Sequence, residues 1–239
     1  MILLCALVGL LVGSLLNWAS DHLPHLALSS TSASFTSIPQ PIPALWHLLT
    51  SSAYRKSLIR LQKSAWLGLA VEGLTASLLA YLWKHVGLSW ELPSLACACS
   101  FLLLIATIDL KYRLIPDVLV YPAALVTLLL RTILPGGNPL TALLSGVVGF
   151  SIFLLAALAQ PGGMGGGDVK LAALIGLIVG FPQALWALAL GILAGGITAI
   201  VLLLTRLRGS KSHIPYAPFL CFGAMIALLY NPIPLVFPF

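Results

Sequence analysis

The sequence predicts an all-α bundle of membrane-spanning helices, because of its composition, its apolar runs and the placement of its charges. Of the 239 residues, 60% are hydrophobic and 8% are charged, and the mean hydropathy is +1.07. A soluble domain carries about 25% charged residues, so this chain cannot cover a water-facing surface. We expect a polytopic membrane protein whose length suits one compact bundle.

Eight stretches are candidates for the spanning helices, each of which needs about 20 apolar residues. They are residues 2–20, 65–86, 93–108, 117–133, 140–158, 168–181, 183–204 and 215–229. The third, sixth and eighth stretches are short for a span. The first lacks both a basic segment before its apolar run and a clear cleavage site, so we expect an uncleaved helix.

The basic residues set the predicted orientation of these helices. With eight spans and the N-terminus outside, ten of the 12 Lys and Arg residues fall on the cytoplasmic side, and only Lys84 and Arg131 lie at outer ends. This asymmetry is the positive-inside bias of multi-pass proteins. The net charge of +6 therefore describes topology, and we expect membrane lipid and no nucleic acid as a partner. We expect the bacterial cytoplasmic membrane as the location.

The chain is expected to divide into a first spanning helix (residues 1–20), a cytoplasmic loop (residues 21–64) and a transmembrane bundle (residues 65–239). The loop begins with a Ser/Thr-rich and proline-containing segment, which is typical of flexible chain. Residues 44–64 combine apolar with basic residues. That pattern suits either an amphipathic helix on the inner leaflet or an ordinary basic loop.

Two aspartates lie where an apolar run meets the predicted cytoplasmic face. Asp109 ends the run that begins at Phe101, and Asp168 follows a glycine cluster and precedes the run to Phe181. An ionised carboxylate at bilayer depth costs several kcal/mol, about 2.5–3.5 on insertion scales, and indicates a functional site. Because the third and sixth helices run in opposite directions, Asp109 and Asp168 should lie at the same depth and form a pair.

Two carboxyl groups in one site titrate as a coupled pair and hold a single proton near working pH. The ionised member takes a proton from a water molecule, while the protonated member polarises a scissile carbonyl group. This is aspartyl-protease chemistry, which needs neither a metal nor an organic cofactor. With the predicted topology, such a site would face the cytoplasm.

Several neighbours are candidates for supporting roles. Gly165 and Gly167 would let the backbone approach a substrate strand or a facing helix closely, and Asp168 itself would cap the helix that it begins. Lys170 would neutralise the site or contact lipid phosphate. Asp117 is either a rival for the second carboxylate or, as is more usual at a helix start, a capping residue.

Other polar residues leave further alternatives. Glu72 would bond to Asn17 or another polar neighbour, or would contact substrate, and Asn17 would bridge two helices. Asp109 alone could be a loop aspartate paired with Lys111 or Arg113. The four cysteines lie in apolar runs without a CxxC pair, so neither a disulfide framework nor a metal site is expected.

The two aspartate segments resemble the paired signatures of the bacterial type IV prepilin peptidases. Residues 107–117 (TIDLKYRLIPD) look like the first signature, and residues 163–171 (GMGGGDVKL) look like the GxGD motif. Weaker resemblances lie at residues 12–24, 69–75 and 214–220. The resemblance covers nearly the whole chain in the family's order.

This resemblance implies an aspartyl endopeptidase that cuts the basic leader from type IV prepilins or pseudopilins, with Asp109 and Asp168 as its catalytic pair. Many members carry two CxxC pairs in the first loop, bind zinc there, and methylate the new N-terminus with S-adenosylmethionine. Residues 21–64 hold no cysteine, so no thiolate zinc site is expected. The methyltransferase activity is therefore doubtful, and S-adenosylmethionine would matter only if that activity is retained.

Two other functions fit a pair of carboxylates in membrane helices. A proton-coupled transporter also places carboxylates there, and it predicts proton-coupled flux without cleavage. Another GxGD intramembrane protease predicts cutting of substrates that lack a pilin-like leader.

Overall fold

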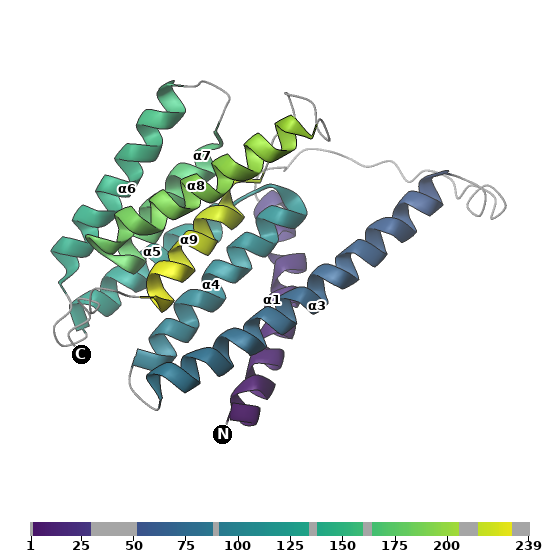
Figure 1. Cartoon of the computed structure of the whole chain (residues 1–239), viewed down its shortest axis with the longest axis horizontal. Coiled ribbons are helices and arrows are strands. Elements are labelled where there is room, and N and C mark those ends of the chain that lie inside the picture. The colour runs from purple at the N-terminus through teal and green to yellow at the C-terminus, as the bar shows by residue number, and fades with distance from the viewer. Residues whose placement is uncertain are drawn as a thin grey trace.

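The computed structural model describes residues 2–29, 52–87, 91–133, 138–159, 164–205 and 215–230. These residues form helices and no strand, so the predicted all-α fold is confirmed (Figure 1). The helices are α1 (Ile2–Ser29), α3 (Ser52–Val86), α4 (Glu91–Tyr112), α5 (Asp117–Ile133), α6 (Pro139–Ala159), α7 (Gly166–Val179), α8 (Gln183–Leu204) and α9 (Ala217–Leu229).

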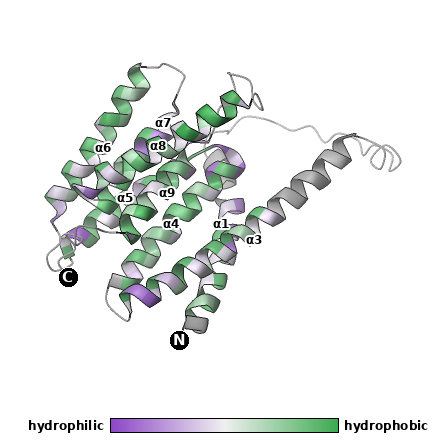
Figure 2. Cartoon of the chain, in the orientation of Figure 1, coloured by the Kyte–Doolittle hydropathy of each residue, from purple (hydrophilic) through white to green (hydrophobic). Residues whose placement is uncertain are grey.

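Four of these helices are long and apolar enough to cross a membrane, judged by length and composition. The segments are Trp66–Val86 of α3, Leu92–Tyr112 of α4, Pro139–Ala159 of α6 and Gln183–Leu202 of α8. The helix α9 is apolar but shorter, and hydrophobic colouring predominates over the bundle in Figure 2. A helical membrane bundle is therefore confirmed, whereas the count of eight spans and the outside N-terminus stay predictions.

The helices α1 and α3 extend into the segment predicted to be a cytoplasmic loop. The helix α1 continues to Ser29 instead of ending near Ser20. The helix α3 begins at Ser52, so residues 52–64, for which the sequence left a helix and a basic loop open, are helical. Once a helix has formed, each added residue gains a hydrogen bond, so polar residues beyond an apolar run can prolong it. Residues 30–51 lie outside the described residues, and the division of the chain into three parts stays a prediction.

The helices α1 and α3 pack as an antiparallel pair at a separation that only glycine allows. A Cβ atom on Gly9 would lie 2.5 Å from the Cα of Ala76, and a Cβ atom on Gly13 would lie 2.7 Å from the Cα of Glu72. In lipid, helices associate through close van der Waals packing, which small residues make possible. These glycines therefore let α1 and α3 approach closely at Ala76 and Glu72.

The centre of the bundle is formed by α4, α7 and α9. The helix α9 contacts both α4 and α7, and α7 also packs against α5, α6 and α8. The buried residues of α7 lie on all of its sides: Val169, Leu171, Ala172, Leu174, Ile175, Gly176, Ile178 and Val179. A helix that is apolar all round lies inside a bundle. Of the four candidate spans, that of α4 is 56% buried and the others are 28% or less.

The residue that follows α4 has an unusual backbone conformation. Arg113 directly follows the helix and has a φ of 54°, and its N–H donates a hydrogen bond of 2.8 Å to the carbonyl oxygen of Asp109. This is the left-handed position that ends many helices and that glycine usually occupies. For a residue with a Cβ atom, the left-handed conformation costs about 1–2 kcal/mol.

Gly176→Ala is expected to lower the free energy of unfolding by about 1–3 kcal/mol, the usual cost of extra atoms in a packed core. A Cβ atom there would lie 2.8 Å from the Cα of Gly146, where α6 and α7 meet. Gly73→Ala is the matched control, because a Cβ atom at Gly73 meets nothing within 4 Å. Thermal unfolding in detergent should separate the two variants, and equal melting temperatures would contradict the close approach of α6 and α7.

Arg113→Gly is expected to raise the free energy of unfolding by about 1 kcal/mol, because glycine adopts the left-handed conformation without a Cβ clash. Arg113→Ala removes the same charge but keeps the clash, so it isolates the backbone effect. Chemical or thermal unfolding of both variants provides the measurement. A glycine variant no more stable than the alanine variant would show that position 113 carries no strain.

Candidate active site

Asp109 lies in the last turn of α4 and is buried, with 6% of its surface exposed. The backbone N–H of Ala217, the first residue of α9, is a hydrogen-bond donor to its carboxyl group. The oxygen Oδ2 is buried and has no hydrogen-bond partner among the described residues. Buried polar atoms are nearly always paired, so this oxygen is a candidate for binding a proton or a water molecule during a reaction.

Asp168 lies in the first turn of α7, but it does not cap that helix as expected. The helix begins at Gly166, and the capping residue is Gly165 with φ −76° and ψ 145°. The N–H of Asp168 donates to the carbonyl oxygen of Gly165 at 3.1 Å. The expectation was wrong because Gly166 and Gly167 adopt helical conformations, so the helix begins two residues before Asp168.

Asp109 and Asp168 lie close enough for the charge of Asp109 to act on the carboxyl group of Asp168. They come from the end of α4 and the start of α7, as the opposite directions of these helices require. Two like charges in a largely buried site disfavour double ionisation. The geometry therefore suits a pair that shares one proton, and a catalytic role for the pair stays a prediction at this point.

The two glycines predicted to support the site have different surroundings. A Cβ atom on Gly167 would lie 3.1 Å from the Cβ of Ile115, in the connection between α4 and α5. A Cβ atom on Gly165 would lie 3.6 Å from Oδ2 of Asp168, and Gly165 is exposed. Gly167 therefore lets the two aspartate-bearing segments pack closely, and Gly165 leaves the approach to Asp168 uncrowded.

Asp117 and Lys170 bind each other. The Lys170 Nζ lies 2.8 Å from each carboxylate oxygen of Asp117 and 5.3 Å from the centre of the Tyr121 ring. The carbonyl oxygen that accepts the first hydrogen bonds of α5 belongs to Pro116. Asp117 is therefore an ion-pair partner in the first turn of α5, and it joins α5 to α7 beside Asp168.

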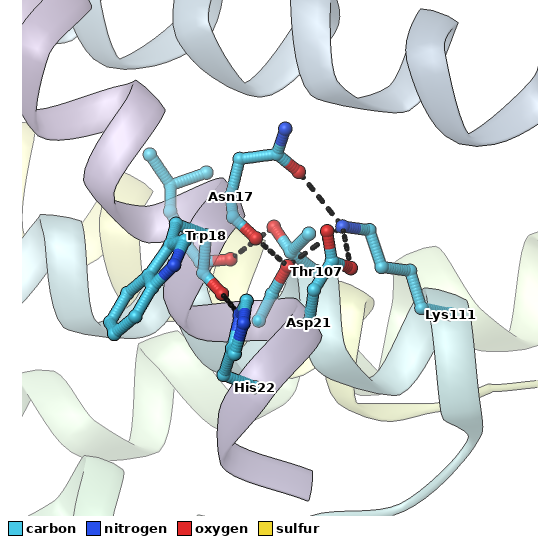
Figure 3. Close-up of polar contacts among 8 residues, drawn as sticks. Asn17, Trp18, Asp21, His22, Thr107 and Lys111 are labelled. Atoms are coloured by element: carbon cyan, nitrogen blue, oxygen red, sulfur yellow. Dashed lines mark hydrogen bonds and ion pairs between the residues drawn. The ribbon is translucent and has the colours of Figure 1, made fainter. Parts of the chain in front are cut away.

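Asn17 bridges helices, as the sequence suggested. Its Oδ1 accepts a hydrogen bond of 2.8 Å from the Nζ of Lys111, which connects α1 to the end of α4 (Figure 3). Glu72 lies on α3 opposite Gly13 and is partly buried. The role of Glu72 stays a prediction.

Three residues near the aspartates were not predicted as site residues, and all lie between Tyr216, which precedes α9, and Cys221 in α9. Ala217 donates to Asp109, Tyr216 lies where the charge of Asp168 acts on its hydroxyl group, and the thiol of Cys221 is fully buried within reach of both aspartate charges. The resemblance at residues 214–220 was a signal for this segment. Cys221 by itself gave none, because a buried cysteine looks like any small apolar residue.

Comparisons with known proteins point to one family. A model of the type IV leader peptidase family matches residues 96–200, a stretch that contains both Asp109 and Asp168. A prepilin leader peptidase/N-methyltransferase of Bacillus subtilis is 30% identical over 162 residues, which cover 68% of this chain and 65% of that protein.

Two further relatives carry the same name. The protein of Pseudomonas aeruginosa is 32% identical over 166 residues, covering 67% of this chain and 57% of its own length. The protein of Stutzerimonas stutzeri is 29% identical over 261 residues, which cover 95% of this chain and 90% of that protein. No solved structure matches the chain significantly. Since the family model and these relatives agree, the chain belongs to the type IV leader peptidase family.

Proposed function

We propose that this protein is an aspartyl endopeptidase that cuts the basic leader from type IV prepilins or pseudopilins. The observation that supports this proposal is the charge interaction between Asp109, at the end of α4, and Asp168, at the start of α7. Both residues lie within the region matched by the family model. The name of the relatives, prepilin leader peptidase/N-methyltransferase, favours this function over a proton-coupled transporter or a different membrane protease.

The reaction would use the shared proton of the pair. The ionised aspartate removes a proton from water, which attacks the carbonyl carbon of the scissile bond, while the protonated aspartate donates a hydrogen bond to the carbonyl oxygen. The proton taken from the water then passes to the departing amine as the carbon–nitrogen bond breaks. Asp109 is deeply buried, whereas Asp168 is partly exposed beside the exposed Gly165 and Gly166. This side of the pair is where a peptide segment would approach.

The substrate class follows from the chemistry of the site and from the family. A pilin precursor is itself a membrane helix with a basic leader on its cytoplasmic side. Its helix would lie beside the bundle, and a glycine at the leader junction would unwind locally and expose the bond to the pair. The predicted positive-inside orientation puts Asp109 and Asp168 at the cytoplasmic face of the bacterial inner membrane.

Asp109→Asn and Asp168→Asn are each expected to reduce leader cleavage by at least 100-fold, since general acid–base groups contribute about 10²–10⁴-fold. Co-expression with a pilin-like precursor from the same genome, followed by a mobility-shift or mass assay, measures processing. Glu91→Gln, at the opposite end of α4, is the matched control and should process normally. Normal processing by either Asn variant in the membrane fraction would remove that aspartate from the catalytic pair.

The processed product is expected to carry an unmethylated N-terminus, because residues 21–64 contain no cysteine with which to bind zinc as many family members do. The test is mass spectrometry of the product after incubation with precursor and S-adenosylmethionine. The Pseudomonas aeruginosa relative, named a peptidase/N-methyltransferase, provides the comparison. A product heavier by one methyl group would show that this chain retains the second activity without the cysteines.

A further inference from the structure

Lys111, in the last turn of α4, is held by α1 through every hydrogen that its ammonium group can donate. Its Nζ lies 2.8 Å from Oδ1 of Asn17, 2.7 Å from Oγ of Ser20 and 2.8 Å from Oδ1 of Asp21 (Figure 3). A lysine ammonium has three donors and no acceptor, so the set is complete. The Lys111 side chain is 8% exposed.

These contacts are strong enough to fix one helix against the other. The three acceptors lie at positions i, i+3 and i+4 of α1, which share one face of the helix. Hydrogen bonds from an ammonium group, one of them to a carboxylate, are stronger than those between neutral groups. A buried ammonium group that loses its partners is costly. The contact therefore resists both rotation and sliding of the α4 end relative to α1.

Asp109 lies two residues before Lys111 in the same turn of α4. Each helical residue is rotated by about 100° from the one before it, so side chains two positions apart point to nearly opposite sides. On one side, α1 holds Lys111. On the other side, Asp109 faces Ala217 of α9 and Asp168 of α7. The direction in which the Asp109 side chain points is thus coupled to the hydrogen bonds between Lys111 and α1.

The contact with α1 matters at this end of α4, because few backbone hydrogen bonds stabilise the last turn of a helix. The last carbonyl groups of any helix lack partners within the helix. Here the helix stops directly after Tyr112, and the N–H of the left-handed Arg113 closes back on the carbonyl oxygen of Asp109. The positive charge of Arg113 acts on the Asp109 carboxyl group. The Lys111 ammonium group points to α1 instead, so its contacts affect Asp109 through the placement of the turn that both residues share.

We propose that Lys111 is a positioning residue for Asp109, whose ammonium group, bound by Asn17, Ser20 and Asp21, fixes the direction in which Asp109 faces Asp168. The proposal rests on the proposed aspartyl endopeptidase function. Lys111 does not touch the reacting atoms, and its three partners belong to a helix that contributes no carboxylate to the pair.

The first test is kinetic and uses the full chain in proteoliposomes with a pilin-like precursor. Lys111→Met keeps the length of the side chain and removes all three donors, and it should lower kcat at least 10-fold with KM within twofold of the parent value. Misplacement of a reacting group by about 1 Å can cost about 100-fold in rate. Lys84→Met is the matched control. Lys84 is exposed in the last turn of α3, so this substitution should leave both constants unchanged.

Restoring the ion pair should restore part of the rate. Asp21→Lys combined with Lys111→Asp exchanges the two charges, and this double variant should have a higher kcat than Lys111→Asp alone. If Lys111→Met fails to insert, Asp21→Asn decides the question, because it removes the charge but not the shape of the partner. A lowered kcat with unchanged KM in Asp21→Asn supports the proposal, and an unchanged kcat overturns it.

The second test measures position without activity. In a cysteine-free background, Asp109→Cys and Asp168→Cys are joined by a short thiol cross-linker, and the yield reports how the two positions face each other. Adding Lys111→Met should reduce this yield severalfold, whereas adding Lys84→Met should not. Unchanged yields with Lys111→Met would overturn the positioning role even if Asp109→Asn abolishes cleavage. A reduced yield would support it even if the protein proved to be no peptidase.

Discussion

A buried carboxyl group at the end of a helix is the constraint on which the rest of this structure depends. Asp109 is nearly inaccessible and one of its oxygens has no partner among the described residues, so its surroundings must compensate for the cost of burying it. They do so from several elements. The helix α9 offers a backbone N–H, α7 brings a second carboxyl group that can share a proton, and α1 holds the turn in which Asp109 lies.

The two lysines nearest in sequence to Asp109 and Asp168 form ion pairs with other acids. Two lysines lie two residues after the two aspartates, at Lys111 and Lys170. Each is bound by a different acid, Lys111 by Asp21 and Lys170 by Asp117. An ammonium group next to either aspartate would favour its ionised form and weaken the sharing of a proton. Lys111 and Lys170 instead bind Asp21 and Asp117, and the positive charge of Arg113 acts on Asp109.

The fold class and the pairing of the aspartates could be predicted because they depend on properties that run along the chain. Apolar runs define membrane helices, and the directions of two helices decide that Asp109 and Asp168 share a depth. The contact between Lys111 and α1 joins positions 90 or more residues apart, and no local pattern encodes it. The capping role expected for Asp168 failed for a local reason, since glycine tolerates both helical and non-helical conformations. The sequence left open which acid Lys111 binds, and tertiary packing decides it.

The shortness of α7 has a consequence for how water reaches the aspartates. Its 14 residues rise about 21 Å at about 1.5 Å per residue, which is less than the hydrocarbon thickness of about 30 Å. The helix α7 packs against α5, α6, α8 and α9, so it lies among other helices of the bundle. Asp168, at one end of this short helix, can therefore lie below the level of the lipid headgroups and still be hydrated from the aqueous side. A hydrolytic reaction at the pair requires water at that depth, and the exposed glycines that precede Asp168 mark the side from which it would arrive.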